Sequence, residues 1–211
     1  MALTDKLTLT FNQDAVTNTV VIDTETLDVT ETAIVLTLSA VKFDRFGDKE
    51  QKMQEIHTAI DVTQQLLQGR THSASTIEWW NKQSDAAIHE LWETCSVRVG
   101  VALNVLAEFI GDCQPFSRGT DFDFKILGHM YKANGKKAPW KFNQVRDVRT
   151  YVDAFTGGTS GYIDGFEKPD WMVAHNSLHD CYRDALLMIQ ARSAVMGEAA
   201  TMAAEAQEQT A

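Results

Sequence analysis

Residues 19–43 read TVVIDTETLDVTETAIVLTLSAVKF, and this stretch decides the fold. Its two apolar runs, 19–23 and 33–43, predict buried strands, while the polar, threonine-rich segment between them predicts a connection. Residues 51–60 (QKMQEIHTAI) predict a third strand, because Gly47 and Asp48 supply a turn that pairs it with the second. The chain is therefore expected to begin as three strands of one sheet.

Helical patterns follow these strands. Helices are predicted at 63–68, 75–83, 96–111, 122–133 and 178–196, a short strand at 114–117, and a flexible loop at 157–161. Strands followed by helices and further strands predict an α/β fold, with a mixed central β-sheet flanked by α-helices. We expect one domain over residues 1–196 and a flexible tail over 197–211.

The composition is that of one ordinary globular domain. The chain has 211 residues, of which 44% are hydrophobic and 23% charged. Its three cysteines are odd in number and not in CxxC spacing, which argues against a disulfide framework and a thiolate zinc site. No secretion signal and no apolar run of membrane-spanning length is present, so a soluble, cytoplasmic protein is expected, in the host cytoplasm if phage-encoded.

The distribution of charge matters more than its sum. A net charge of -10 argues against a nucleic-acid partner, because phosphate binding draws on Lys and Arg. Between Lys125 and Arg149, however, seven basic residues face only Asp147, a local charge of +6. Charge alone leaves two interpretations of this segment equally open, a nucleic-acid surface and an ordinary solvated helix and loop.

Acidic residues end three separated apolar segments. Asp23 and Glu25 lie two apart in VVIDTET, so on a strand both side chains point to the same face. Asp123 lies in DFDFKIL, and Asp180 lies five residues after His175 in AHNSLHDC. Carboxylates from three segments with one histidine nearby are what a two-metal phosphodiester hydrolase requires.

Helical geometry separates the two histidines of the last motif. At about 100° per residue, Asp180 projects from a face that is otherwise apolar, where a carboxylate needs a partner such as a divalent cation. A helix-capping role, from Ser177-x-x-Asp180, is compatible with this. His179 lies on a polar stripe expected to face solvent, whereas His175 precedes the helix and can overhang the site. We therefore favour His175 as a general base.

Several blocks of the sequence resemble a known family. DTET, then FD before a helix, then H-x-x-x-x-D resemble the DEDDh (DnaQ-like) 3′–5′ exonucleases. STIEWWNKQS, FDFKIL, APWKFNQVRDVRT and AHNSLHDCYRDALLM are similar to the DexA-type exonucleases of tailed phages and their exoribonuclease relatives, over about residues 20–192. The resemblance implies a ribonuclease H-like fold. It also implies that Asp23, Glu25, Asp123 and Asp180 are metal ligands and that His175 is the base, with Asp121 only a neighbour of Asp123.

Such an enzyme would bind two Mg²⁺ ions, with Mn²⁺ as a substitute, and His175 would take a proton from the attacking water. Thr26 and Leu27, directly after Glu25, are expected to contact the terminal nucleotide. Adjacent on a helix, Trp79 and Trp80 cannot both face one surface, so we expect one in the core and the other stacking on a base or closing over the site; core packing of both stays open. Arg146 and Arg149 are candidates for phosphate contacts or for an internal ion pair with Asp147.

The sequence thus predicts a single-domain, metal-dependent 3′–5′ exonuclease that releases nucleoside 5′-monophosphates from DNA with a free 3′ end. RNA is the first alternative. A catalytically silent nucleic-acid-binding module is disfavoured because all five catalytic positions are present, and a hydrolase of free nucleotides would not need the basic segment. A homodimer is expected only by analogy with related enzymes.

Overall fold

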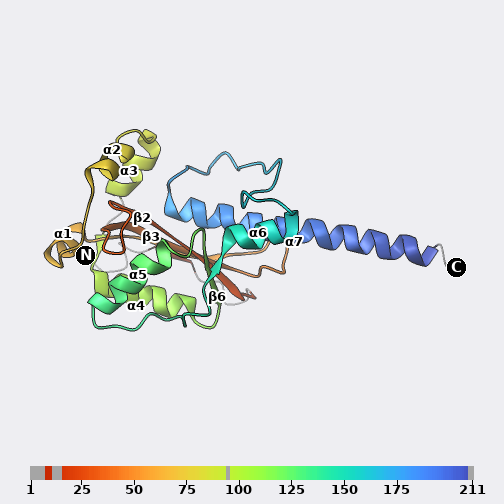
Figure 1. Cartoon of the computed structure of the whole chain (residues 1–211), viewed down its shortest axis with the longest axis horizontal. Coiled ribbons are helices and arrows are strands. Elements are labelled where there is room, and N and C mark those ends of the chain that lie inside the picture. The colour runs from red at the N-terminus through yellow and green to blue at the C-terminus, as the bar shows by residue number, and fades with distance from the viewer. Residues whose placement is uncertain (1–7, 11–15, 94–95, 209–211) are drawn as a thin grey trace.

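The computed structural model of the chain describes residues 8–10, 16–93 and 96–208. In this part of the chain, a mixed sheet of seven strands lies between helices on both faces (Figure 1). The strands are β1 (Thr8–Thr10), β2 (Thr19–Thr26), β3 (Val35–Phe43), β4 (Gln54–Ile60), β5 (Ser96–Val97), β6 (Gln114–Ser117) and β7 (Arg146–Asp147). Their order is β1-β4-β3-β2-β6-β7, with β5 paired to β4. β2 therefore lies inside the sheet, antiparallel to β3 and parallel to β6.

Two pairs of helices cover the two faces of the sheet. α4 (Val99–Ile110) and α5 (Asp123–Ala133) form the larger core with one face, and α6 (Val148–Thr156) and α7 (Ser177–Glu208) form a second core with the other. The shorter helices are α1 (Val62–Leu67), α2 (Ala74–Trp80) and α3 (Asp85–Glu93). They gather at one end of the molecule, whereas the C-terminal part of α7 projects past the sheet at the other end (Figure 1).

The alternation of side chains along β2 decides which face receives the acids. Val20 and Ile22 belong to the core under α4 and α5, whereas Val21 belongs to the core under α6 and α7. Because the side-chain period of a strand is two, Asp23 and Glu25 continue the row of Val21 toward α7. The residue between them continues the other row, toward α5. The strand thus presents its carboxylates to α7.

Most predicted elements are confirmed, with informative differences. The strands predicted at 19–23, 33–43, 51–60 and 114–117 are β2, β3, β4 and β6. The helix predicted over 96–111 begins only at Val99, because residues 96–97 pair with β4 as β5. Helices α3 and α6 were not predicted. α7 continues to Glu208, so residues 197–208, interpreted from sequence as a flexible tail, are helical, while 209–211 lie outside the described residues.

Among the described residues, no helix combines the length and the apolar character needed to cross a membrane.

Candidate active site

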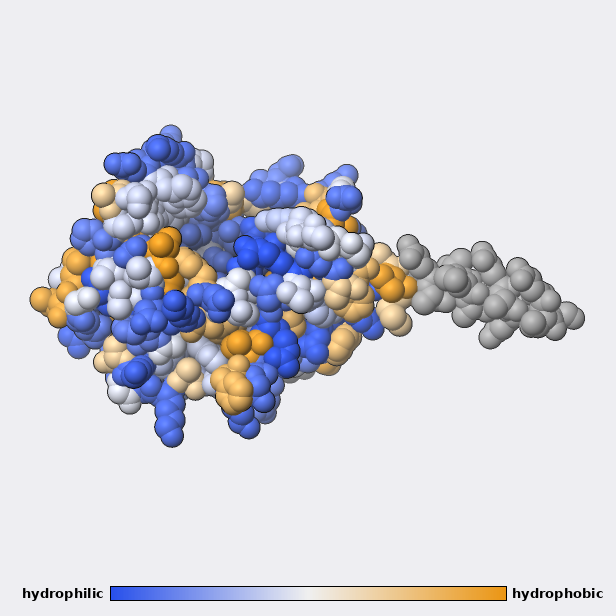
Figure 2. All heavy atoms as spheres, in the orientation of Figure 1, coloured by the Kyte–Doolittle hydropathy of each residue, from blue (hydrophilic) through white to orange (hydrophobic). Residues whose placement is uncertain are grey.

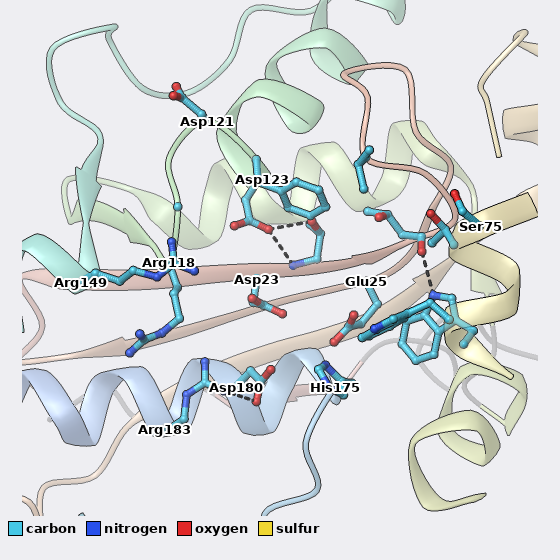
Figure 3. Close-up of a pocket in the computed structure, with 18 of the residues that line it drawn as sticks. Asp23, Glu25, Ser75, Arg118, Asp121, Asp123, Arg149, His175, Asp180 and Arg183 are labelled. Atoms are coloured by element: carbon cyan, nitrogen blue, oxygen red, sulfur yellow. Dashed lines mark hydrogen bonds and ion pairs between the residues drawn. The ribbon is translucent and has the colours of Figure 1, made fainter. Parts of the chain in front are cut away.

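A cavity of about 830 Å³ opens at the end of β2, where α2, α5 and α7 meet. The hydropathy view shows hydrophilic side chains gathered in the middle of this face of the molecule, between the α2–α3 region and α7 (Figure 2). In the close-up, carboxylates from three segments of the chain point into the cavity (Figure 3). The acidic residues that line it are Asp23, Glu25, Asp121, Asp123 and Asp180.

The acids on β2 and α7 meet as the sequence predicted. Asp180 lies in the first turn of α7, and Glu25 lies near the end of β2. Ligand atoms of Glu25, His175 and Asp180 all lie within 4.8 Å of one another. Residues 150 or more positions apart in the sequence therefore join in one group that can hold a metal ion.

Asp123 approaches the same strand from its other face. It is the first residue of α5, is 2% exposed, and its Oδ1 accepts hydrogen bonds from the backbone N–H and the hydroxyl of Thr24, at 3.0 and 2.7 Å. Burial raises the pKa of Asp123 to about 7, although the two bonds from Thr24 oppose this shift. Asp121, by contrast, is exposed and lies toward the rim of the cavity (Figure 3). Of the two acids in TDFDF, Asp123 is thus the one that reaches β2.

Charge repulsion at this site is strong. Burial raises the pKa of Asp23 well above its usual value, and the carboxylates of Asp123, Glu25 and Asp180 raise it further. Burial also raises the pKa of Asp180, opposed by the guanidinium of Arg183, whose Nη1 lies 2.7 Å from Asp180 Oδ1. Carboxylate oxygens are the ligands that Mg²⁺ and Mn²⁺ prefer, and such ions would relieve this repulsion. The donor set therefore fits divalent cations.

The start of α7 is fixed to the sheet by side-chain hydrogen bonds. The hydroxyl of Ser177 lies 2.9 Å from that of Thr37 and 2.7 Å from that of Ser39, both on β3. Asn176 caps the helix, because its Oδ1 accepts the N–H of His179 at 2.9 Å. The cap is thus Asn176, one residue before the Ser177 of the predicted capping box. These contacts set the position of Asp180 opposite β2.

His175 overhangs the carboxylates from the loop before α7, as predicted. It has a positive φ of 61°, a left-handed conformation that few residues other than glycine adopt. Its ring centroid lies 4.7 Å from that of Trp79 and 6.5 Å from that of Trp80, both edge-on. Two aromatic rings therefore hold a histidine whose backbone is already constrained.

The two tryptophans lie in different surroundings. Trp80 is 6% exposed, packs with Leu36 and Ala87, and donates its indole N–H to the carbonyl of Thr26 at 2.9 Å. Trp79 is 40% exposed and faces the cavity beside His175. One ring belongs to the core and the other is accessible to a ligand.

The interpretation of His179 as a solvent-facing residue is wrong. The side chain is half-buried, and its Nδ1 accepts the backbone N–H of Val173 at 2.9 Å. Its ring lies edge-on to Trp171, with 5.1 Å between centroids. His179 therefore holds the segment that leads into His175, a role that helical periodicity alone does not reveal.

Only some of the residues predicted to contact the substrate line the cavity. Thr26 and Arg149 line the cavity. Leu27 and Arg146 do not line it. Leu27 packs with the cluster around Trp80, and Nη1 of Arg146 donates to the carbonyls of Asn143 and Val145, at 2.7 and 2.9 Å.

The internal ion pair considered for the two arginines is not formed. Asp147 instead caps α6 by accepting the N–H of Thr150 at 2.7 Å, and it accepts the N–H of Gly119 at 2.9 Å. Within the described part of the chain, neither Arg146 nor Arg149 pairs with it. Of the seven basic residues between Lys125 and Arg149, only Arg149 lines the cavity.

Sequence reasoning missed several residues that line the cavity. Arg118 follows β6, and its Nε lies 2.9 Å from Oδ1 of Asp184, an oxygen that also pairs with Nε of Arg183 at 3.0 Å. Arg183 and Asp184 lie three and four residues after Asp180, and this nearness to the histidine–aspartate motif was the one available signal for them. Arg118 has no comparable signal, because only the fold brings it to the site. The other missed lining residues are Thr24, Val29, Ser75, Thr76, Gly119, Phe122 and Tyr162.

Comparisons with known proteins identify the family of the chain. Residues 18–195 match the family model described as the 3′–5′ exoribonuclease Rv2179c-like domain. The exodeoxyribonuclease of Enterobacteria phage T4 is 30% identical over 210 aligned positions, which cover 84% of this chain and 90% of the phage protein.

Comparison with solved structures identifies the fold. Escherichia coli exonuclease I in complex with a dT13 oligonucleotide superposes with a TM-score of 0.51 at 10% identity, covering 83% of this chain. A product-bound exonuclease I superposes with a TM-score of 0.53, also at 10% identity, covering 87%. The chain spans less than half of either structure, 40% and 46%. This likeness confirms the predicted ribonuclease H-like fold. With most of its length matched by the family model, the chain belongs to the Rv2179c-like 3′–5′ exoribonuclease domain family, and it is a DnaQ-like 3′–5′ exonuclease.

Proposed function

We propose that this exonuclease is metal-dependent and removes nucleoside 5′-monophosphates from the 3′ end of DNA, with His175 as the general base. The observation that carries the proposal is the meeting of Glu25, His175 and Asp180, whose ligand atoms lie within 4.8 Å of one another. The proposed metal ligands are Asp23, Glu25, Asp123 and Asp180. Two Mg²⁺ ions are the proposed cofactors, and Mn²⁺ would substitute for them.

The residues divide the work of hydrolysis. When bound, divalent ions supply positive charge against the scissile phosphate and lower the pKa of a nearby water. His175 accepts the proton of the attacking water, a task suited to a histidine. Its position against Trp79 and its constrained backbone keep the ring over the carboxylates. Thr24 orients Asp123 through two hydrogen bonds and so aligns α5 with β2.

The terminal nucleoside is proposed to lie at the aromatic end of the cavity, formed by Trp79, Trp80 and His175. Trp79 presents an accessible ring for stacking on a base. Val29 is 74% exposed at the edge of the same cavity, and Thr26 contributes to its wall. Val29 thereby has the position at the terminal nucleotide that was predicted for Leu27.

DNA is the proposed polymer because the 30% identical phage relative is named an exodeoxyribonuclease. RNA is the second candidate, favoured by the description of the family model as an exoribonuclease domain. The hydroxyls of Ser75 and Thr76 line the cavity and offer partners for a sugar hydroxyl, which is where a protein distinguishes the two polymers. We further propose that the protein acts inside the cell and as a homodimer. A sedimentation mass of one chain would contradict the dimer.

Matched DNA and RNA oligomers, labelled in parallel at either end, test the proposal. With Mg²⁺, a 5′-labelled DNA strand should shorten one nucleotide at a time, and a 3′-labelled strand should release labelled monophosphate at once. Asp180→Asn is the control for contaminating nucleases and should be inactive. Faster shortening of RNA than of DNA would overturn the polymer assignment. Shortening that persists unchanged in EDTA would overturn the metal dependence.

A further inference from the structure

The cavity has a second end that the proposed chemistry does not use. Three arginines from three segments line it on the side away from His175: Arg118 after β6, Arg149 on α6 and Arg183 on α7 (Figure 3). We call this the basic end. The metal-binding carboxylates lie between it and the aromatic end. A nucleic acid that crosses the site would thus meet rings on one side and guanidinium groups on the other.

The backbones of two glycines, Gly119 and Gly161, approach the Arg149 side chain closely. A Cβ added at Gly161 would lie 2.5 Å from the Arg149 Cβ, and one added at Gly119 would lie 3.2 Å from its Nη1. Both glycines have positive φ, 71° and 106°. The backbone of Gly161 therefore approaches this side chain more closely than any larger residue would allow, and at Gly119 the positive φ disfavours one. The Arg149 side chain is exposed, and its guanidinium forms no hydrogen bond with a residue in the described ranges.

Arg118 supplies a second, buried positive charge beside it. Its side chain is 7% exposed, its Nη2 donates to the carbonyl of Gly161 at 3.0 Å, and its guanidinium lies 4.3 Å from the Tyr162 ring centroid. Its Nη1 is buried and has no hydrogen-bond partner among the residues that the structure describes. A buried N–H of a charged group without an acceptor is costly, and the positive charge of Arg118 favours an anion in the adjoining cavity.

The acids nearby do not neutralise this end. Asp184 accepts from both Arg118 and Arg183, so with Asp180 two carboxylates stand against the three guanidinium groups. Arg183 also pairs with Asp180, which we assign to the metal site. Arg149 adds its charge without an acid of its own in the described part of the chain. The basic end therefore keeps a positive excess that suits a phosphate group.

The chemistry of a 3′ exonuclease fixes which phosphate this is. The released monophosphate carries only the scissile phosphate, and beyond it on the 3′ side there is a nucleoside with a free hydroxyl. Any further phosphate of the substrate must therefore lie on the 5′ side of the scissile bond. The aromatic end suits the terminal nucleoside, so the basic end receives the upstream strand.

We propose that Arg149, supported by Arg118, binds the phosphate of the second linkage from the 3′ end. This inference rests on the proposed function and assigns the neighbouring subsite of the same cavity. Binding there would hold the strand in register, so that the first linkage lies over the carboxylates. The enzyme would then recognise the charge of a linkage that it does not cut.

Oligonucleotides with one neutral linkage test this. A methylphosphonate removes the negative charge of a single linkage, so we compare a DNA 12-mer neutral at the second linkage with one neutral at the fifth, using either diastereomer. The readout is kcat/KM for release of the first nucleotide. The second-linkage oligomer should be cut about tenfold or more less efficiently than the unmodified strand, as expected for loss of a charged hydrogen bond. The fifth-linkage oligomer should match the unmodified strand.

Variants connect the effect to the arginines. In Arg149→Ala, the ratio of kcat/KM between the unmodified and second-linkage oligomers should fall to near one. In Arg118→Lys, which keeps a charge for Asp184, the ratio should fall partway. Arg146→Ala is the matched control, because this neighbouring arginine does not line the cavity, and it should keep the full ratio.

Each outcome has a distinct meaning. Equal cleavage of the second- and fifth-linkage oligomers by the wild-type enzyme would overturn the inference and leave the exonuclease function standing. A ratio unchanged in Arg149→Ala would also overturn it, provided that the thermal unfolding of the variant shows it to be folded. If the unmodified strand is not shortened from its 3′ end, the proposed function fails and the inference fails with it.

Discussion

Asp123 lies directly against Thr24, the residue between the two acids of β2, and accepts both its backbone N–H and its hydroxyl. The contact fixes the start of α5 to the strand that carries Asp23 and Glu25. Because a strand alternates its side chains, Thr24 can hold Asp123 on one face while its neighbours point to α7 on the other. One short strand thus joins the two halves of the site.

Thr24→Val tests this contact. The substitution keeps the shape of the side chain but removes one hydrogen bond to a buried carboxylate, so the free energy of unfolding should fall by about 1–3 kcal/mol. Asp123 would also be held less firmly, and more Mg²⁺ should be needed for half-maximal activity. Urea denaturation and Mg²⁺ titration measure the two effects. Thr24→Ser restores the hydroxyl and should behave like the wild type; equal losses in both variants would contradict the role of the bond.

The crowded carboxylates predict an unusual dependence of stability on pH. Asp123 has a folded-state pKa of about 7, whereas an unfolded aspartate has a pKa of about 3.9. Between these values the folded chain keeps a proton that the unfolded chain has lost, so stability should fall as pH rises from about 4 to about 7. The pKa of Asp23 is raised in the same direction.

Thermal unfolding in EDTA across this pH range measures the effect. Saturating Mg²⁺ should raise the melting temperature, most at the upper end of the range, because the ions stabilise the ionised carboxylates. Asp123→Asn cannot ionise and should flatten the EDTA profile. A metal-free profile that rises between these pH values would contradict the assigned repulsion.

Truncation of Leu27 should lower stability, whereas truncation of Trp79 should raise KM. Leu27 packs in the small cluster around Trp80, so Leu27→Ala should lower the free energy of unfolding by about 1–2 kcal/mol with little change in KM. Trp79 is accessible in the cavity, so Trp79→Ala should raise KM by about tenfold through lost base stacking. Steady-state kinetics with urea denaturation separate the two. A raised KM in Leu27→Ala at unchanged stability would restore its predicted contact with the substrate.

The direction of the Leu27 side chain could not be predicted from the sequence, unlike that of Asp23 and Glu25. Alternation along β2 correctly placed Asp23 and Glu25 on one face, because a regular strand has a period of two. The pairing of β2 with β3 is irregular between Glu25 and Thr26, where the register shifts. Beyond that point the alternation no longer indicates direction, and Leu27 turns into the cluster around Trp80.

Residues with a local pattern were predictable, and residues placed only by the fold were not. The loop position of His175 and the buried face of Asp180 follow from helical periodicity within one segment. Arg118 has no such pattern, because its partner Asp184 lies 66 positions away. The basic segment could not be interpreted from its charge, because charge in the sequence does not indicate which side chains face the cavity. Of the seven basic residues from Lys125 to Arg149, only Arg149 lines it.

The two histidines of the last motif offer the sharpest separation of roles. His175→Ala removes the proposed base, so kcat should fall by about 10²–10⁴-fold, whereas Mg²⁺ binding should persist on the carboxylates. His179→Ala leaves the N–H of Val173 without its acceptor and loosens the segment that leads into His175. We expect a smaller fall in kcat, of about tenfold, since a misplaced base is less damaging than a missing one.

The pH profile distinguishes the base from the residue that positions its loop. Loss of the base should change the dependence of kcat on pH, whereas His179→Ala should keep the wild-type dependence at a lower plateau. His179→Gln keeps an acceptor in the side chain and should recover part of the rate. If His179→Ala turned over at the wild-type rate, the bond to Val173 would be irrelevant to catalysis. If His175→Ala kept the wild-type dependence of kcat on pH, another group would have to be the base.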